Sequence, residues 1–222
     1  MSTKPFLPFL LCLGWIAMTA PAIAQAATPP AEDAPWLFRF GVANIQNSSK
    51  ASLNVGGAPI PGAALHFDQI YTPMVEIGYR FTDDFAAVAT LGFPPTISAS
   101  GAGSIAGYGK LEGTTWGPTA FTVQYQPFHD GVLRPYVGAG VSYMIIFSTH
   151  AAAVQNPGLS NDLAPALEAG TEIAISDQYG LFIEAKKAFL SSNATGTIGG
   201  FPLTGTADLS PWVFSVGMGL HF

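Results

Sequence analysis

The segment 212–222 alternates between two kinds of side chain at every second position. One parity carries only large apolar residues, and the other carries mostly small or polar ones. The two sets are Trp212, Phe214, Val216, Met218, Leu220 and Phe222 against Val213, Ser215, Gly217, Gly219 and His221. Side chains of a β-strand point to opposite faces with a period of two, so this pattern predicts a strand with one strongly apolar face. A soluble barrel buries such a face, whereas a membrane barrel turns it toward lipid and keeps the small and polar set inside.

Similar alternation recurs along the chain, with a weaker parity in 85–93. The eight expected strands span 36–44, 70–81, 85–93, 119–126, 134–147, 167–175, 179–190 and 212–222. Short turns alternate with four long connections rich in Gly, Ala, Ser, Pro and Asn, at 46–69, 94–118, 148–166 and 191–207. We therefore predict an all-β fold, an eight-stranded antiparallel transmembrane β-barrel with short periplasmic turns and four long extracellular loops. The even strand number places both chain ends on the periplasmic side of an outer membrane of the Gram-negative type.

The composition agrees with a membrane barrel. Charged residues make up 10% of the chain, against roughly 25% in soluble domains. Aromatic residues gather at both ends of the expected strands, as in the two girdles of membrane barrels. A soluble up-and-down barrel such as a lipocalin is the alternative, but it explains neither the two girdles nor the scarcity of charge. The formal net charge of −6 provides no basic patch, so we expect no nucleic-acid partner.

The N-terminal segment has the organisation of a secretory signal peptide. Lys4 precedes an uncharged apolar run from Phe6 to Ala20, and Ala22 and Ala24 have the spacing of a cleavage site. The apolar run is shorter than the roughly 20 residues that a membrane-spanning helix needs. We expect a signal peptide over 1–24, a flexible lead-in over 25–35 and the outer-membrane barrel over 36–222. The single cysteine, Cys12, lies in the signal segment, so the mature chain has no thiol chemistry.

The parity that faces the barrel interior carries charged residues. Opposite charges can pair across a lumen that is just wide enough for side chains, and an unpaired buried ion costs several kcal/mol. We expect a charged plug in the periplasmic half, formed by Arg39, Glu76, Arg80, Arg134, Glu168, Glu172, Glu184 and Lys186. Interior positions nearer the loops are small or apolar, and Met74, Met144 and Val213 are candidates for an apolar passage. Pro73, Pro135 and Pro211 fall in or beside strands and are candidates for a lateral gap.

No arrangement of residues points to catalysis. The four histidines, His66, His129, His150 and His221, have no neighbours at metal-ligand spacing. A compact set of Ser, His and acidic residues is also missing from the sequence. We expect neither an enzyme nor a cofactor nor a metal.

Three stretches resemble the OmpW family of outer-membrane proteins and its AlkL-type subgroup. They are 133–141, 208–214 and 53–57, and the R-P-Y-V-G-A-G run at 134–140 is the most specific. The resemblance implies a channel for passive uptake of small hydrophobic molecules, with lateral release into the membrane and no cofactor. The partners that the resemblance implies are outer-membrane lipid, small hydrophobic solutes and the barrel-insertion machinery. This machinery recognises a terminal strand that ends on an aromatic residue such as Phe222. The alternative is a non-conducting structural or adhesion barrel whose loops bind partners such as phage or bacteriocins.

Overall fold

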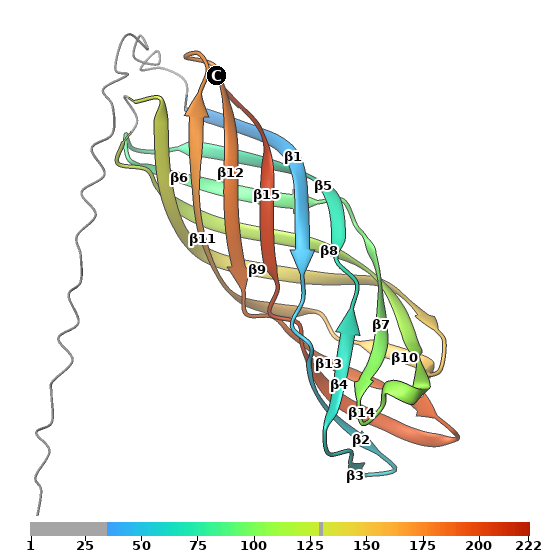
Figure 1. The fold of residues 1–222 in the computed structure, drawn as a ribbon. Helices are drawn as coiled ribbons and strands as arrows, with labels where there is room; N and C mark the ends of the chain where they lie inside the picture. The colour runs from blue at the N-terminus through green and yellow to red at the C-terminus, as the bar shows by residue number, and fades with distance from the viewer. Residues whose placement is uncertain (1–34, 129–130) are drawn as a thin grey trace, which may run out of the picture.

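A closed barrel of eight antiparallel strands forms the body of the molecule (Figure 1). The computed structural model describes residues 35–128 and 131–222, so the expected signal peptide, the lead-in up to residue 34 and His129 lie outside the described residues. The barrel strands are β1 (Trp36–Gln46), β5 (Ile70–Arg80), β6 (Phe85–Gly92), β8 (Lys110–Tyr125), β9 (Leu133–Ala151), β11 (Asp162–Ala174), β12 (Tyr179–Ala188) and β15 (Trp212–His221). Within the described ranges, no helix has the length and apolar character needed to cross a membrane.

The first and last strands close the barrel. They pair continuously from Leu37 opposite His221 to Gln46 opposite Trp212. Trp36 and Phe222 extend the closure, because the backbone N–H of each donates to the carbonyl oxygen of the other at 3.0 and 3.1 Å. Closure leaves no unpaired strand edge in the wall, which is the condition for a sheet to stand in a medium without water. The prediction of an eight-stranded antiparallel barrel is confirmed.

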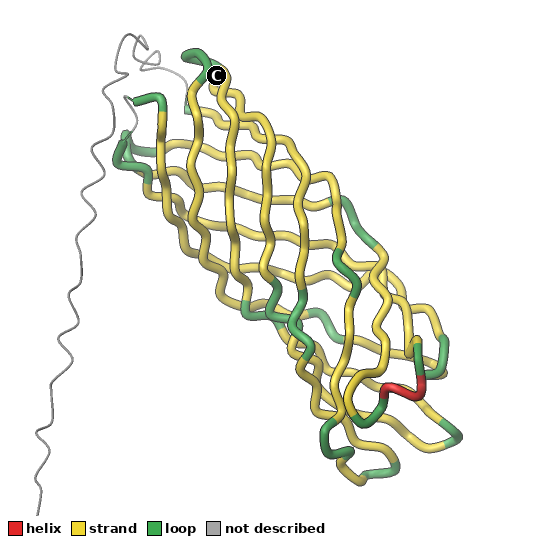
Figure 2. The backbone as a smooth tube through the Cα atoms, viewed as in Figure 1, coloured by secondary structure: helices red, strands yellow, loops and turns green. Residues whose placement is uncertain are grey.

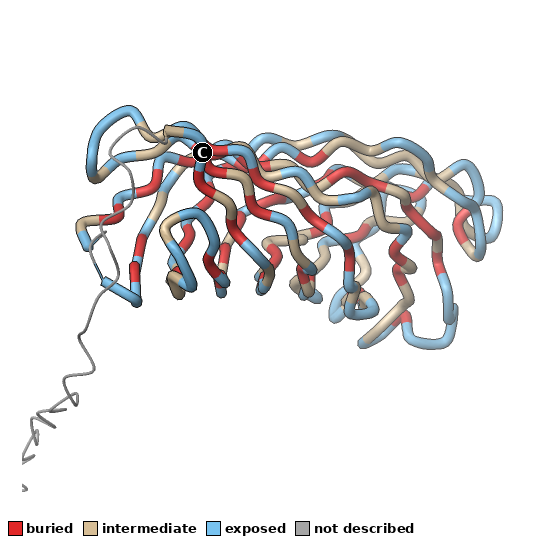
Figure 3. Tube along the Cα trace, turned by 90° about the horizontal axis from the view of Figure 1, so that it is seen from above, coloured by how far each residue is buried: buried red, intermediate tan, exposed pale blue. Residues whose placement is uncertain are grey.

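Burial alternates along the strands, as the tube in Figure 3 shows. In β15, Phe214, Val216 and Met218 are exposed on the outer wall, whereas Ser215 and Gly219 are buried inside. The large apolar parity therefore faces outward, and the barrel encloses the small and polar parity. This arrangement is the inverse of a soluble barrel, and it is the arrangement that lipid requires.

The four long connections differ from the expected irregular loops, because most of their residues form strands (Figure 2). They contain β2 (Lys50–Val55), β3 (Ala58–Pro59), β4 (Ala63–Phe67), β7 (Thr96–Gly103), β10 (Gln155–Leu159), β13 (Ser191–Ile198), β14 (Phe201–Asp208) and the single-turn 3₁₀ helix η1 (Ala106–Tyr108). The strands β8 and β9 also run past their expected ends at 119 and 147. The order β10-β13-β14-β2-β4-β7-β8 continues the wall beyond the barrel. We call this part the extension, and we call the opposite end, with the turns 81–84 and 175–178, the turn end.

Two glycine pairs make the tight hairpins of the extension. Gly56-Gly57 separates β2 from β3 with φ angles of 59° and 83°, and Gly199-Gly200 separates β13 from β14 with 56° and 84°. Positive φ at both central residues is the requirement of the type I′ hairpin turn, and glycine meets it without steric cost. These dipeptides are therefore hairpin signals within segments that the sequence predicts to be loops.

Candidate functional site

An ion-pair network fills the barrel interior above the turn end. Arg39 of β1 is 1% exposed, and its guanidinium lies 3.3 Å from Glu76 Oε2 and 3.3 Å from Glu172 Oε2. Nη1 of Arg39 also donates to Gln124 Oε1 at 3.3 Å, and the guanidinium carbon lies 4.6 Å from the centroid of the Tyr136 ring. One arginine thus joins side chains of β1, β5, β8, β9 and β11 across the lumen.

Lys186 of β12 is the second hub of this network. Its Nζ lies 3.3 Å from Glu76 Oε1, 2.9 Å from Glu168 Oε2 and 3.2 Å from Glu184 Oε1. The same ammonium donates to Thr90 Oγ1 at 2.7 Å. Three buried carboxylates from three different strands therefore share a single lysine, and Glu76 is also paired with Arg39.

The remaining predicted plug residues lie nearer the turn end. Arg134 Nη1 is 3.9 Å from Glu172 Oε1, and His221 Nε2 is 2.6 Å from the same oxygen. Arg80 is half-buried and donates to Gln126 Oε1 at 3.0 Å. The structure therefore brings all the predicted plug residues except Arg80 into one connected set of ion pairs, with Arg80 beside it. Sequence reasoning had not included His221 in this set, although the interior parity of β15 contains it.

An apolar cavity lies above the network, and we call it the lower cavity. It holds about 50 Å³ of space, and Ile45, Met74, Trp116, Leu190 and Val213 contribute to its apolar wall. Its polar lining includes Glu184, Lys186 and Ser215. Of the three residues predicted for an apolar passage, Met74 and Val213 line this cavity. Met144 is 1% exposed and packs instead in the adjoining apolar cluster with Ile45 and Trp116.

A second apolar cavity of about 60 Å³ lies in the extension, and we call it the upper cavity. Leu53, Leu65, Leu111 and Leu203 belong to its lining, as does Glu112 of β8. Burial raises the pKa of the Glu112 carboxyl above its ordinary value, and the opposing hydrogen bond from Thr114 Oγ1 spans 3.4 Å. Sequence reasoning missed this cavity because its residues come from segments expected to be loops, although their apolar residues were a visible signal.

The ladder between β6 and β8 is interrupted beside the lower cavity. Paired positions stop at Leu91 opposite Thr119 and resume, with β7, at Thr96 opposite Thr115. Four residues of one side, 92–95, therefore face three of the other, 116–118. Pro94, Pro95 and Pro118 fall in this interval, and proline has no backbone N–H to donate. Gly92 and Pro118 also line the lower cavity, so the interruption adjoins its wall.

The prolines singled out from the sequence do not interrupt the ladder. Pro73 lies within the continuous register of β1 and β5, and its carbonyl oxygen accepts from Phe93 N at 2.9 Å. Pro135 lies within the continuous register of β9 and β11. Pro211 precedes β15 and accepts from Ala188 N at 3.2 Å. Pro73 and Pro135 lie just beyond the pairings of their strands with β6 and β8, where a missing N–H costs little. The β6–β8 interval instead has prolines on both partners.

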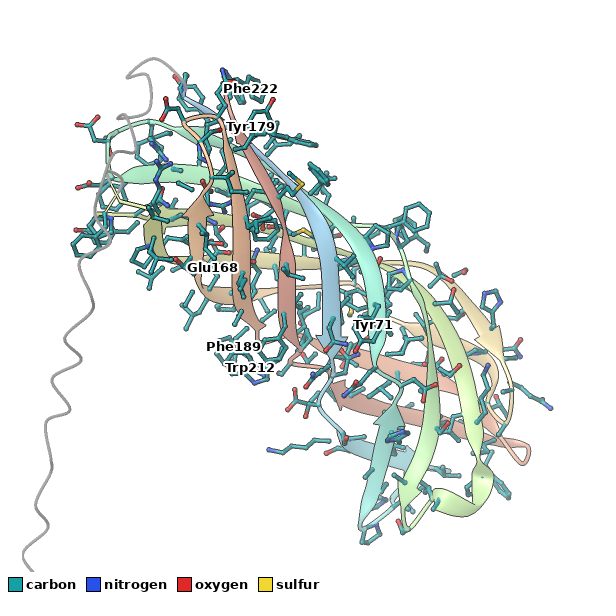
Figure 4. All side chains as sticks on the ribbon, turned by 45° about the horizontal axis from the view of Figure 1, so that its top comes forward. Tyr71, Glu168, Tyr179, Phe189, Trp212 and Phe222 are labelled. Carbon is teal, nitrogen blue, oxygen red and sulfur yellow. The ribbon has the colours of Figure 1, made fainter. Side chains whose placement is uncertain are left out.

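The outer wall carries aromatic residues at both of its ends. Figure 4 shows Tyr179 and Phe222 at the turn end, and Phe189 and Trp212 at the opposite end of the barrel wall. Lys187 Nζ lies 5.3 Å from the Trp212 ring centroid and 5.9 Å from that of Phe189, as a cation does at a bilayer surface. Between the ends, the exposed residues of the wall are largely apolar. A closed barrel with an apolar wall, aromatic ends and a charged interior defines a membrane barrel of the bacterial outer-membrane class.

Comparison with known proteins identifies the family within this class. The profile of the OmpW family matches residues 33–222, and the chain belongs to this family. The Dibenzothiophene metabolism operon protein PahQ of Pseudomonas aeruginosa is 28% identical over 207 residues, which cover 93% of this chain and 98% of PahQ. The Outer membrane protein AlkL of Ectopseudomonas oleovorans is 24% identical over 188 residues, which cover 84% of this chain and 82% of AlkL.

Solved structures show the same fold. The crystal structure of the outer membrane protein OprG from Pseudomonas aeruginosa superposes with a TM-score of 0.79 at 20% identity, covering 85% of this chain and 96% of OprG. The structure of AlkL in lipid bilayers superposes with a TM-score of 0.70 at 24% identity, covering 92% of this chain and 97% of AlkL. The family resemblance and the barrel predicted from the sequence are confirmed, and the protein is an outer-membrane barrel.

Proposed function

We propose that the protein is a channel for passive uptake of small apolar molecules, which enter through the extension and leave sideways into the membrane. The extension faces the cell exterior in this proposal, and both chain termini face the periplasm. The observation that carries the proposal is the stacking of two apolar cavities above an ion-pair network that blocks the way to the turn end. PahQ, a relative along nearly its whole length, is named for an operon of dibenzothiophene metabolism, which is consistent with an apolar aromatic solute.

The energetics favour a sideways exit over passage through the network. An apolar solute that crossed the plug would separate buried ion pairs, and breaking one such pair costs roughly 3–5 kcal/mol. Transfer into hydrocarbon instead gains about 25 cal/mol for each Å² of apolar surface removed from water. The interrupted ladder at Gly92 and Pro118 is the proposed exit, because fewer backbone hydrogen bonds resist separation there. Leu91 and Phe121 are exposed on the outer wall beside it and continue the apolar surface into the bilayer.

This function needs no chemical step, so we propose no enzymatic activity and no cofactor. Interaction with outer-membrane lipid follows from the apolar wall. For assembly, we propose that the barrel-insertion machinery binds the C-terminal strand, whose final residue Phe222 is exposed.

A substitution that fills the lower cavity tests the proposal. Ala188→Phe places a ring in the lower cavity, because Ala188 is buried in its lining. Ala185→Phe is the matched control: it adds the same ring on the same strand, but on the parity of the exposed Leu181 and Ile183. We expect Ala188→Phe to slow the uptake of naphthalene and dibenzothiophene several-fold, in cells that express the variant as their only copy, while Ala185→Phe keeps the original rate.

Folding of both variants is verified by circular dichroism of the purified barrels. Uptake that is equal in wild-type cells, in the Ala188→Phe variant and in cells without the protein would contradict the channel. The structural or adhesion barrel would then be the better interpretation.

A further inference from the structure

Two neighbouring residues of the lower cavity each carry a buried polar atom that makes no hydrogen bond. Glu184 of β12 and Ser215 of β15 are directly opposite in the strand register, and both line the cavity. They are 2% and 3% exposed. Within the described part of the chain, Ser215 Oγ has no hydrogen-bond partner. Glu184 Oε1 also accepts no hydrogen bond, and its close contact is the ion pair with Lys186 Nζ at 3.2 Å. The other carboxylate oxygen, Glu184 Oε2, already accepts from the Tyr136 hydroxyl at 3.1 Å.

The orphaned Ser215 hydroxyl requires a partner, and Glu184 Oε1 can still accept a hydrogen bond beside its ion pair with Lys186. Leaving a buried hydroxyl or carboxylate oxygen without a hydrogen bond costs more than a typical hydrogen bond gains, so buried polar groups are paired with protein, water or ligand. The two atoms are also chemically complementary to one kind of group. A serine hydroxyl can donate or accept, and a carboxylate oxygen accepts only. A single group that both donates and accepts can satisfy the two together.

We infer that the lower cavity is a binding site for apolar molecules that carry one hydroxyl group, such as aliphatic alcohols and phenols. The ligand hydroxyl donates to Glu184 Oε1 and accepts from Ser215 Oγ, while its hydrocarbon part packs against Ile45, Met74 and Val213. The inference rests on the proposed function and names the substrate class for it. A molecule bound in this way lies beside the interrupted ladder, since Gly92 and Pro118 belong to the same cavity lining.

The surrounding charges select against other polar groups. A carboxylate would lie beside Glu184, and Lys186 of the cavity lining already serves Glu76 and Glu168 as well. An ammonium group would have to bind Glu184 Oε1, which lies 3.2 Å from Lys186 Nζ. The two positive charges would then repel each other. A pure hydrocarbon leaves Ser215 Oγ and Glu184 Oε1 without a hydrogen bond. A neutral hydroxyl adds no charge and satisfies both.

The size of the cavity suits a short molecule. A cavity needs on the order of 10–15 Å³ of volume to hold one water molecule. The volume of the lower cavity is about 50 Å³. It therefore accommodates a chain of a few heavy atoms beyond the hydroxyl, and 1-hexanol is a suitable probe. Hexane, hexanoate and hexylamine are its matched analogues without a polar group, with a negative group and with a positive group.

Two methionines of the barrel provide a reporter and an internal control. Met74 lines the lower cavity, whereas Met218 faces outward on the lipid side of β15. With methyl-labelled methionine and the protein in lipid nanodiscs, nuclear magnetic resonance follows both methyl groups during a titration. We expect the Met74 signal to shift and saturate with 1-hexanol. The Met218 signal responds only to probe molecules that partition into the lipid. We therefore expect this signal to shift without reaching saturation.

Two serine variants test the role of the orphaned hydroxyl. Ser215→Ala removes it, and we expect 1-hexanol binding to weaken roughly three- to tenfold while hexane binding is unchanged. Ser142→Ala is the matched control, because Ser142 lines the same cavity but its hydroxyl already donates to the Thr119 carbonyl at 2.9 Å. That variant should alter hexanol and hexane affinity to the same degree and leave their ratio at the wild-type value.

Thermal unfolding of the ligand-free variants provides a second measurement. Ser215→Ala loses no hydrogen bond and should not lower the Tm, whereas Ser142→Ala loses one and should lower it. Equal hexanol-to-hexane ratios in the wild type and Ser215→Ala would overturn the hydroxyl site, and so would tighter binding of hexanoate or hexylamine than of 1-hexanol. Neither result would contradict the proposed channel, because that proposal is tested separately by naphthalene uptake in the Ala188→Phe variant.

Discussion

At the scale of single residues, the interior depends on a few cations that each serve several carboxylates. Lys186 contacts Glu76, Glu168 and Glu184, which are buried on three different strands. Removal of one partner of a buried pair leaves an uncompensated charge, and this costs more than the pair itself contributes. The adjacent Lys187 lies on the opposite face, where it donates to the Ser210 carbonyl and lies near the Trp212 ring. A comparison of Lys186 with Lys187 therefore distinguishes the effect of a buried lysine from that of a lysine on the outer surface.

We predict that Lys186→Met destabilises the barrel by roughly 3–5 kcal/mol, because it leaves three carboxylates without their shared cation. Lys187→Met should cost about 1 kcal/mol or less, since it removes only surface contacts. Equilibrium unfolding by urea in lipid vesicles measures both values. Similar losses for the two variants would mean that the buried network contributes little to stability.

At the scale of elements, each strand of the wall has one face for lipid and one for the interior. The strand β15 shows this most clearly, because Val216 is 56% exposed on the outside while its neighbour Ser215 is buried. The interrupted ladder between β6 and β8 is also a property of elements, since it requires prolines on both partners. Neither property belongs to any one residue, and in the proposed function both determine where an apolar solute leaves the barrel.

We predict that Val216→Arg destabilises the protein by roughly 2–4 kcal/mol, because it places a charge on the lipid face far from the aromatic ends. Thr204→Arg is the control, since Thr204 is exposed on β14 in the extension, which the proposed orientation leaves in water. Unfolding in vesicles should detect a loss for the first variant and almost none for the second. A tolerated arginine at position 216 would argue that this face of β15 does not meet hydrocarbon.

At the scale of the whole molecule, the chain combines a closed barrel with an extension that continues its wall. The barrel ladder is complete without the extension, because β12 pairs with β15 up to Lys187 opposite Trp212. The hairpin of β13 and β14 contributes Ser192 and Leu203 to the upper cavity. The barrel therefore contains the ion-pair network and the lower cavity, and the extension contains the upper cavity.

Deletion of residues 191–208 should leave a folded barrel but open the upper cavity to water. We expect uptake of apolar solutes to fall, since the first apolar site of the proposed path is lost. Replacement of Gly199-Gly200 by Asn-Gly is the control, because Asn-Gly supports the same type I′ turn and preserves the hairpin. Circular dichroism and whole-cell uptake measure the two outcomes. A deletion variant that fails to fold would show that the extension belongs to the folding unit of the barrel.

The sequence by itself determined the barrel and the outward face of each strand, and it indicated which charged residues would share the interior parity, except His221. Alternation is a local property with a period of two, so a segment such as 212–222 displays its two faces without any knowledge of its neighbours. The contrast between an apolar and a polar parity also implied lipid outside, and the scarcity of charge agreed with it. The aromatic ends followed from the same segments.

Only the tertiary structure decided which residues meet. Arg39 contacts Glu172 because closure of the barrel brings strands that are distant in sequence across a narrow lumen. Glu184 faces Ser215 because of one strand register, and a shift by a single residue would separate them. The strands of the extension formed in segments of small and polar residues, since their backbone hydrogen bonds depend on neighbouring strands rather than on their own composition. The interrupted ladder likewise exists only because 92–95 and 116–118 lie opposite each other, which non-local pairing alone can establish.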